Sequence, residues 1–141
     1  MMRKKRLAIF TMWLISAVCL AQTNKPFEGY LYNEEYQIYI QLNVYDKNIM
    51  VPDQDIYGEL PGYLGSKRDS RLWLITDAKQ LNEKSVELSV INDYGSEDFT
   101  ARLTVDDKGV YTFKHVEGST YKIVVNSKYV KIPKVITFVK R

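Results

Sequence analysis

The chain is poor in the residues that carry most metal and nucleophile chemistry. It has one cysteine, Cys19, and one histidine, His115, among 141 residues. A lone cysteine forms no intramolecular disulfide, so packing and backbone pairing must hold the fold together. Zinc sites and nucleophilic triads place a histidine beside a nucleophile or two further ligands. We therefore interpret His115, which lies in a strand-like stretch, as a structural residue.

Long apolar runs are also scarce. The one at residues 7–20 follows a basic cluster at residues 3–6 and is shorter than the roughly 20 residues of a spanning helix. This order is typical of an export signal. Small residues at Cys19 and Ala21 predict cleavage after Ala21, which makes residues 1–21 a signal peptide and residues 22–141 one domain. The alternative is a lipoprotein anchored at Cys19, although Val18 stands where a lipoprotein signal has a tiny residue.

Excess positive charge is missing once the signal is set aside. Four of the 20 basic residues lie at residues 3–6, leaving 16 basic against 17 acidic residues. This balance argues against nucleic acid as a partner. Without the signal peptide, the chain also has no membrane-spanning stretch. We expect a protein of the periplasm or the cell exterior.

The remaining charge is unevenly spread. Residues 22–107 include 8 basic and 16 acidic residues, whereas residues 108–141 include 8 basic residues and 1 acidic residue. In a closed barrel the last strand would pair with an early one, which places Lys134, Lys140 and Arg141 beside Glu28, Glu34 and Glu35. The second interpretation is a surface patch for an acidic partner or anionic headgroups, formed by Lys122, Lys128, Lys131 and Lys134.

What the chain has in quantity is short alternating runs. Residues 36–45 are the clearest, because Ile38, Ile40 and Leu42 share one side of the alternation while Tyr39 and Gln41 share the other. A period of two predicts a half-buried strand. Further strands are expected at residues 27–32, 55–60, 71–76, 85–92, 97–105, 109–116, 119–126 and 134–141. A turn or two of helix is expected at residues 77–84.

Eight or nine short strands with hairpin links predict an all-β fold, an antiparallel barrel or sandwich. The three runs between residues 97 and 126 are joined by tight turns and predict a meander. A barrel is favoured over a sandwich because sequential hairpins that close on themselves leave no exposed edge.

Acidic clusters provide no convincing catalytic or metal site. Asp53, Asp55 and Glu59 surround Gly58 as in a calcium loop, but Leu64 stands where such a loop has its bidentate carboxylate. Glu34 and Glu35 are adjacent, so on a strand they would point to opposite faces instead of facing each other across a pocket. We predict no metal, no cofactor and no enzymatic activity.

Two sets of residues are candidates for binding. The first is a connecting loop at residues 60–69, in which Tyr63, Leu64, Lys67 and Arg68 would meet a partner protein or plug the end of the barrel. The second is the polar side of the strand at residues 36–45, where rings and amides would suit a small ligand such as a glycan. Its residues are Tyr39, Gln41, Asn43 and Tyr45.

The stretches "FEGYLYNEEYQIYIQLNVYD", "IYGEL" and "RLWLITD" give the chain a family resemblance. It resembles small exported β-barrel proteins of Gram-negative bacteria, which open with an aromatic-x-Gly strand and a long alternating strand. The late Gly-x-Trp of that group is replaced here by "GSTYKIVV". The resemblance implies the fold and the export, and it supplies no catalytic residues.

The sequence thus predicts an exported, non-enzymatic binding protein that contacts another protein. An inhibitor or immunity protein against an enzyme acting on the cell envelope is one concrete form. The alternative is a lipocalin-like binder of a small ligand, a glycan or a lipid, that uses the barrel interior or the polar strand face.

Overall fold

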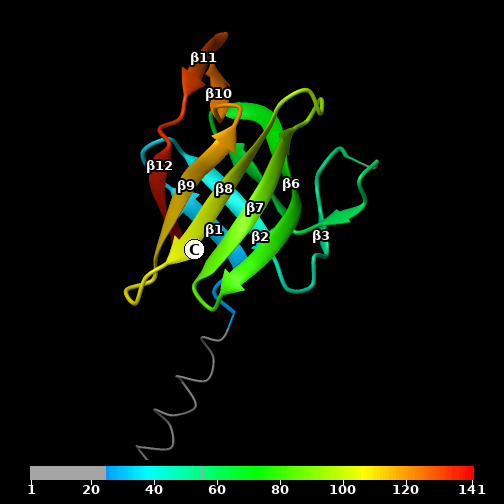
Figure 1. The fold of residues 1–141 in the computed structure, drawn as a ribbon. Coiled ribbons are helices and arrows are strands. Elements are labelled where there is room, and N and C mark those ends of the chain that lie inside the picture. The colour runs from blue at the N-terminus through cyan, green and yellow to red at the C-terminus, as the bar shows by residue number, and fades with distance from the viewer. Residues whose placement is uncertain (1–24, 55) are drawn as a thin grey trace, which may run out of the picture.

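The computed structural model describes residues 25–54 and 56–141, in which eight strands form a closed antiparallel barrel (Figure 1). The strand order is β1-β12-β9-β8-β7-β6-β5-β2. Its members are β1 (Glu28–Asn33), β2 (Ile38–Asn43), β5 (Gly62–Ser66), β6 (Asp69–Asn82), β7 (Ser85–Asn92), β8 (Asp98–Val105), β9 (Val110–Gly118) and β12 (Val135–Lys140). The prediction of an all-β antiparallel fold is confirmed, as a barrel. The signal peptide, Cys19 and the cut after Ala21 lie outside the described residues.

Strict alternation explains why these segments are strands. Along β7, every second residue is buried, and Val86, Leu88 and Val90 point into the barrel. Residues that share one face of a strand are two apart, so an alternating sequence buries a continuous apolar row only as a strand. The same pattern holds along β2 and β8.

The barrel interior is filled with side chains. Phe27 and Phe138 are fully buried, and the Phe113 ring meets the Phe138 ring edge-on, with centroids 6.0 Å apart. Aliphatic residues from the barrel strands complete this core. An eight-stranded barrel is just wide enough for its side chains to fill it. The interior is therefore a packed core over most of its length.

The barrel closes between the first and last strands of the described chain. β1 pairs with β12, with Leu31 opposite Lys140 and Tyr32 opposite Val139. Next to this seam, the Arg141 guanidinium lies 3.0 Å from the Glu34 carboxylate. The expected pairing of basic and acidic ends is thus confirmed for Arg141 and Glu34. Among the described residues, Lys134, Lys140 and Glu35 form no ion pair, and Glu28 pairs with Lys25.

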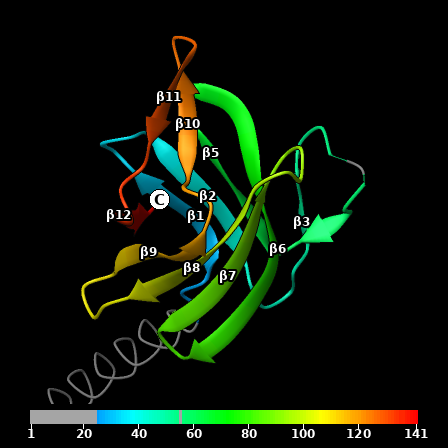
Figure 2. The same ribbon diagram turned by 45° about the horizontal axis from the view of Figure 1, so that its top comes forward.

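Two hairpins stand outside the barrel. β3 (Ile49–Met50) and β4 (Glu59–Leu60) form a flap between β2 and β5, and the flap packs Val51 and Leu60 over Leu74 on the outer surface. β10 (Lys122–Val125) and β11 (Lys128–Lys131) form a second hairpin between β9 and β12, which we call the arm. Figures 1 and 2 show the arm projecting beyond one end of the barrel.

The predicted meander of residues 97–126 is wrong in its third strand. β8 pairs with β9 as expected, but β10 pairs with β11, and β12 takes the place beside β9. The turn of the arm explains the choice, because Asn126 and Ser127 have φ of 53° and 64°. Two successive positive φ values are typical of the tight turn that joins adjacent hairpin strands.

The helix expected at residues 77–84 is also absent from the structure. β6 runs unbroken to Asn82, and Lys79 and Gln80 pair with Glu87 and Val86 of β7. Local helix preference amounts to tenths of a kcal/mol per residue, so backbone pairing within a sheet outweighs it. The chain turns just after, where the Asn82 side chain accepts a hydrogen bond from the Lys84 N–H at 2.9 Å.

Tyr121 anchors the arm in the core and leaves one polar atom without a partner. Its side chain is 3% exposed and meets Trp73 edge-on, with centroids 5.4 Å apart. Within the described residues, its hydroxyl makes no hydrogen bond, and burial strongly raises its pKa. A buried hydroxyl without a partner costs free energy.

We expect Tyr121→Phe to raise the free energy of unfolding by about 1 kcal/mol, because it removes that cost and keeps the ring. The matched control is Tyr111→Phe, since the Tyr111 hydroxyl donates a hydrogen bond to the Pro26 carbonyl. The control should lower stability by about 1 kcal/mol. Urea unfolding of both variants gives the comparison, and a loss of stability in Tyr121→Phe would show that its hydroxyl is satisfied.

Candidate functional site

The segment expected as a contact loop is a strand and a tight turn. Residues 62–66 form β5, and Lys67 and Arg68 form the exposed turn to β6. Alternation along β5 sends Tyr63 to the outer surface and Leu64 into the core, where its exposed fraction is 0%. The prediction of Leu64 as a contact residue is therefore wrong, because no partner reaches it in the folded protein.

Strand pairing brings the two predicted sets together on the outer surface. β2 lies between β1 and β5, so Gln41 is opposite Tyr63 and Tyr39 is opposite Gly65. On the other side, Tyr30 is opposite Gln41 and Tyr32 is opposite Tyr39. We call this surface, made by Tyr30, Tyr32, Tyr39, Gln41 and Tyr63, the tyrosine face.

The rings of the tyrosine face contact one another. Tyr30 stacks on Tyr39 with centroids 5.6 Å apart, and Tyr63 meets Tyr39 edge-on at 6.2 Å. Gly65 allows this arrangement, because a methyl group at residue 65 would lie 2.5 Å from the Tyr39 hydroxyl oxygen. The Tyr39 ring thus lies over bare backbone, and its orientation is fixed by its neighbours.

Two cations border the tyrosine face. The Lys67 ammonium lies 4.7 Å from the centroid of the Tyr32 ring, and the Arg141 guanidinium lies 4.1 Å from it. Such cation–π contacts contribute roughly 0.5–1 kcal/mol at exposed sites. They bury Tyr32 and hold two positive groups beside three partly exposed rings. Arg68 is exposed in the turn next to Lys67.

Tyr30, Tyr39 and Tyr63 of this face are neutral hydrogen-bonding groups at physiological pH. Burial raises the pKa of Tyr30, Tyr39 and Tyr63 above the ordinary value of 10.0, and for Tyr30 and Tyr39 the neighbouring tyrosines add to the effect. A neutral phenol both donates and accepts hydrogen bonds. The face therefore offers apolar rings, three hydroxyl groups and the Gln41 amide, flanked by positive charge.

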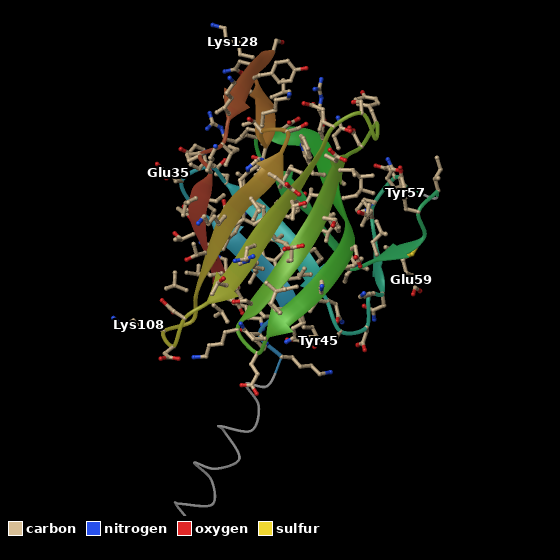
Figure 3. All side chains as sticks on the ribbon, viewed as in Figure 1. Glu35, Tyr45, Tyr57, Glu59, Lys108 and Lys128 are labelled. Atoms are coloured by element: carbon tan, nitrogen blue, oxygen red, sulfur yellow. The ribbon has the colours of Figure 1, made fainter. Side chains whose placement is uncertain are left out.

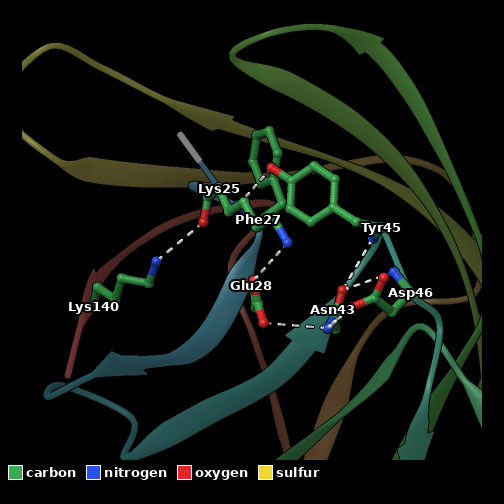
Figure 4. A network of polar contacts seen from close by, with 7 residues as sticks. All are labelled: Lys25, Phe27, Glu28, Asn43, Tyr45, Asp46 and Lys140. Atoms are coloured by element: carbon green, nitrogen blue, oxygen red, sulfur yellow. Dashed lines mark hydrogen bonds and ion pairs between the residues drawn. The ribbon is translucent and has the colours of Figure 1, made fainter. Parts of the chain in front are cut away.

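Asn43 and Tyr45 belong to a different part of the molecule. Asn43 is buried, and its side-chain oxygen accepts hydrogen bonds from the N–H groups of Tyr45 and Asp46 at 3.1 and 2.9 Å (Figure 4). The Tyr45 hydroxyl accepts one from the Phe27 N–H at 3.1 Å. The prediction that both line one ligand face with Tyr39 is wrong, because β2 ends at Asn43 and the chain turns there.

Tyr45 instead lines a hollow at the end of the barrel where the described chain begins. This hollow has a volume of about 1180 Å³, and its lining includes Tyr45, Tyr111, Lys25, Lys84 and Lys140. The two tyrosine hydroxyls already hold the entering chain at Phe27 and Pro26. Lys84 pairs with Asp107, and Lys25 pairs with Glu28. Much of the polar lining of the hollow therefore already has partners within the protein.

Of the residues weighed for catalysis or metal binding, Asp55 lies outside the described residues and His115 is held by structural contacts. His115 stacks on Phe99, and its Nε2 lies 2.8 Å from the Ser119 carbonyl oxygen, a structural arrangement. In the part of the chain that the structure describes, no three His, Cys, Asp or Glu side chains come together as a metal site requires. None of the described residues forms a helix with the length and apolar character needed to cross a membrane.

Comparisons with protein-family models, with curated proteins and with solved structures were made for the whole chain. None gives a match. The resemblance to small exported barrel proteins therefore stays a prediction from the sequence.

Sequence reasoning missed three residues of the face and its border: Tyr30, Tyr32 and Arg141. A signal for the first two is present, because "YLY" and "YQIY" flank the short turn "NEE" and a hairpin places them side by side. Arg141 reaches the face only because β12 closes the barrel against β1. That contact depends on a pairing across the length of the domain.

Proposed function

We propose that the protein is an exported, non-enzymatic binding protein that contacts another protein through the tyrosine face. The observation that carries the proposal is the gathering of four tyrosines on the outside of a packed barrel, with Lys67 and Arg141 both against the ring of Tyr32. Tyrosine and arginine are enriched at protein interfaces, and tyrosine dominates many of their energetic centres.

The geometry of the face supports this proposal. Ring stacking and the close approach over Gly65 hold the tyrosines in place before any partner arrives, so binding costs little side-chain entropy. An inhibitor or immunity protein against an enzyme of the cell envelope is the concrete form we favour. Such a protein needs a stable fold and a rigid contact surface, and it needs no catalytic group.

The test is site-specific photo-crosslinking in the native host. A benzophenone amino acid at Tyr30 or Tyr63 should give one adduct of defined mass, and the same group at Arg102 should give none. Arg102 is the matched control because β8 lies on the opposite side of the barrel from β2. Tyr30→Ala should then weaken binding of the captured protein at least tenfold, with unfolding nearly unchanged. Equal adducts from all three positions would contradict the proposal.

A second candidate function is binding of a small ligand at the hollow lined by Tyr45 and Tyr111. Its volume of about 1180 Å³ is the observation in its favour. Calorimetric titration with a panel of glycans and lipids tests it, with Tyr45→Phe as the variant that keeps the ring. Heat that is lost in the variant would favour this candidate over the tyrosine face.

A further inference from the structure

The arm is an addition to a barrel that closes without it. β9 pairs directly with β12, so the chain between them is free to form a separate hairpin. Tyr121, Ile123 and Ile132 bury the base of the arm in the main core. The arm is therefore fixed at its base and exposed at its tip, where Figure 3 shows Lys128 farthest from the barrel.

The two edges of the arm differ in their contacts with the barrel. On β10, the Val124 N–H donates a hydrogen bond to the Asp69 carboxylate at 2.8 Å, which ties part of that edge to the barrel. Within the described residues, β11 pairs with β10 alone. An exposed strand edge is a template on which a further strand can pair.

The charged side chains of β11 itself are both positive, Lys128 and Lys131. Lys122 and Lys131 lie directly opposite each other, and Lys128 follows at the tip. No acidic residue occurs between Glu117 and the last residue, Arg141. Lys122 is neutralised by Glu97 at 2.7 Å, whereas Lys128 and Lys131 form no ion pair among the described residues.

Tyr129 gives the same edge an exposed aromatic anchor. Its side chain is 66% exposed, and the Lys122 ammonium lies 5.3 Å from its ring centroid. The Arg71 guanidinium lies beside its hydroxyl, and this contact raises the pKa of Arg71. An exposed ring with basic side chains nearby, next to an open strand edge, is suited to a carboxylate-bearing polypeptide.

We propose that the arm is a docking site for an acidic, extended segment of a partner protein, which pairs with the open edge of β11. This site is separate from the tyrosine face. A second copy of the chain is a poor occupant, because two β11 edges would place lysine against lysine. A lipid surface is also disfavoured, since the tip residues Asn126, Ser127 and Lys128 are all polar.

The experiment measures binding of a fluorescein-labelled decapeptide of alternating glutamate and valine by fluorescence anisotropy. We expect saturable binding that weakens with added salt, and no binding of a decapeptide with lysine in place of glutamate. The Lys128→Glu, Lys131→Glu double variant should weaken binding at least tenfold. The matched control, Lys79→Glu with Lys108→Glu, makes the same charge change away from the arm and should bind as the wild type does. Figure 3 shows Lys108 at the opposite end of the barrel.

A third peptide tests the strand pairing itself. Methylating alternate backbone nitrogens of the acidic peptide keeps its charge and removes its ladder hydrogen bonds, so binding should be lost. Equal binding of this peptide, or an equal loss in both double variants, would overturn the proposal. Arm-dependent binding to phosphatidylserine vesicles, without binding of the acidic peptide, would overturn it in favour of a lipid surface. None of these readouts depends on the tyrosine face.

Discussion

Replacing Leu64 by alanine is expected to lower the free energy of unfolding by about 2–5 kcal/mol. Leu64 lies on the inner side of β5 with an exposed fraction of 0%, so the shorter side chain leaves a cavity in the main core. Guanidinium unfolding followed by fluorescence measures the change. A loss of this size places Leu64 in the packing of the barrel and removes it from any contact surface.

Leu81→Ala is the matched control, because it deletes the same atoms from a side chain that is 41% exposed on β6. Its effect should stay within about 0.5 kcal/mol, as for most surface substitutions. Equal effects of the two variants would contradict the inward orientation of Leu64. Loss of partner binding by Leu64→Ala at unchanged stability would restore the original contact hypothesis.

Replacing Gly118 by alanine is expected to cost about 3 kcal/mol or more, because strain and overpacking add there. Gly118 ends β9 with φ of 97°, a backbone conformation that residues with a side chain rarely adopt. A methyl group there would also lie 2.6 Å from the Asp98 carbonyl oxygen and 2.7 Å from the Phe99 Cα. The neighbouring β8 backbone would have to move, and the base of the arm with it.

Gly109→Ala separates the two contributions to this loss of stability, backbone strain and overpacking. Gly109 has a similar φ of 81° in the turn between β8 and β9, but a methyl group there meets nothing within 4 Å. Gly109→Ala should lower the free energy of unfolding only by the backbone strain of an alanine at positive φ, about 1–2 kcal/mol. The difference between the two variants in equilibrium unfolding measures the clash with β8, and equal costs would show that β8 gives way freely.

Much of the barrel is predictable from the sequence, since its determinants are local. Val86, Leu88 and Val90 are two residues apart, so they lie on one buried face only if the segment is a strand. This period of two determines the fold class. The predictions of secondary structure and strand order are wrong where pairing between distant segments determines the structure. Lys79 and Gln80 extend β6 because β7 is present beside them, and residues 122–125 leave the meander because β12 pairs with β9 instead.

The candidate site is predictable in its residue types and unpredictable in its assembly. Tyr39, Gln41, Tyr63 and Lys67 were each recognisable from the sequence, but as members of two separate sets. The register of β2 against β5 unites them, and no local pattern encodes that register. Asn43 and Tyr45 lie outside the tyrosine face because β2 ends at Asn43. The turn that ends β2 is stabilised by the Asn43 side chain.

The seam between β1 and β12 has a consequence for how the chain folds. Of the described strands, β12 is synthesised last, and it covers the edges of both β1 and β9. Until it arrives, the nascent polypeptide has two unsatisfied strand edges, and contacts such as Arg141 with Glu34 must bridge a separation of 107 residues. Closure is therefore a late, long-range step, and intermediates that lack β12 are the species most exposed to aggregation.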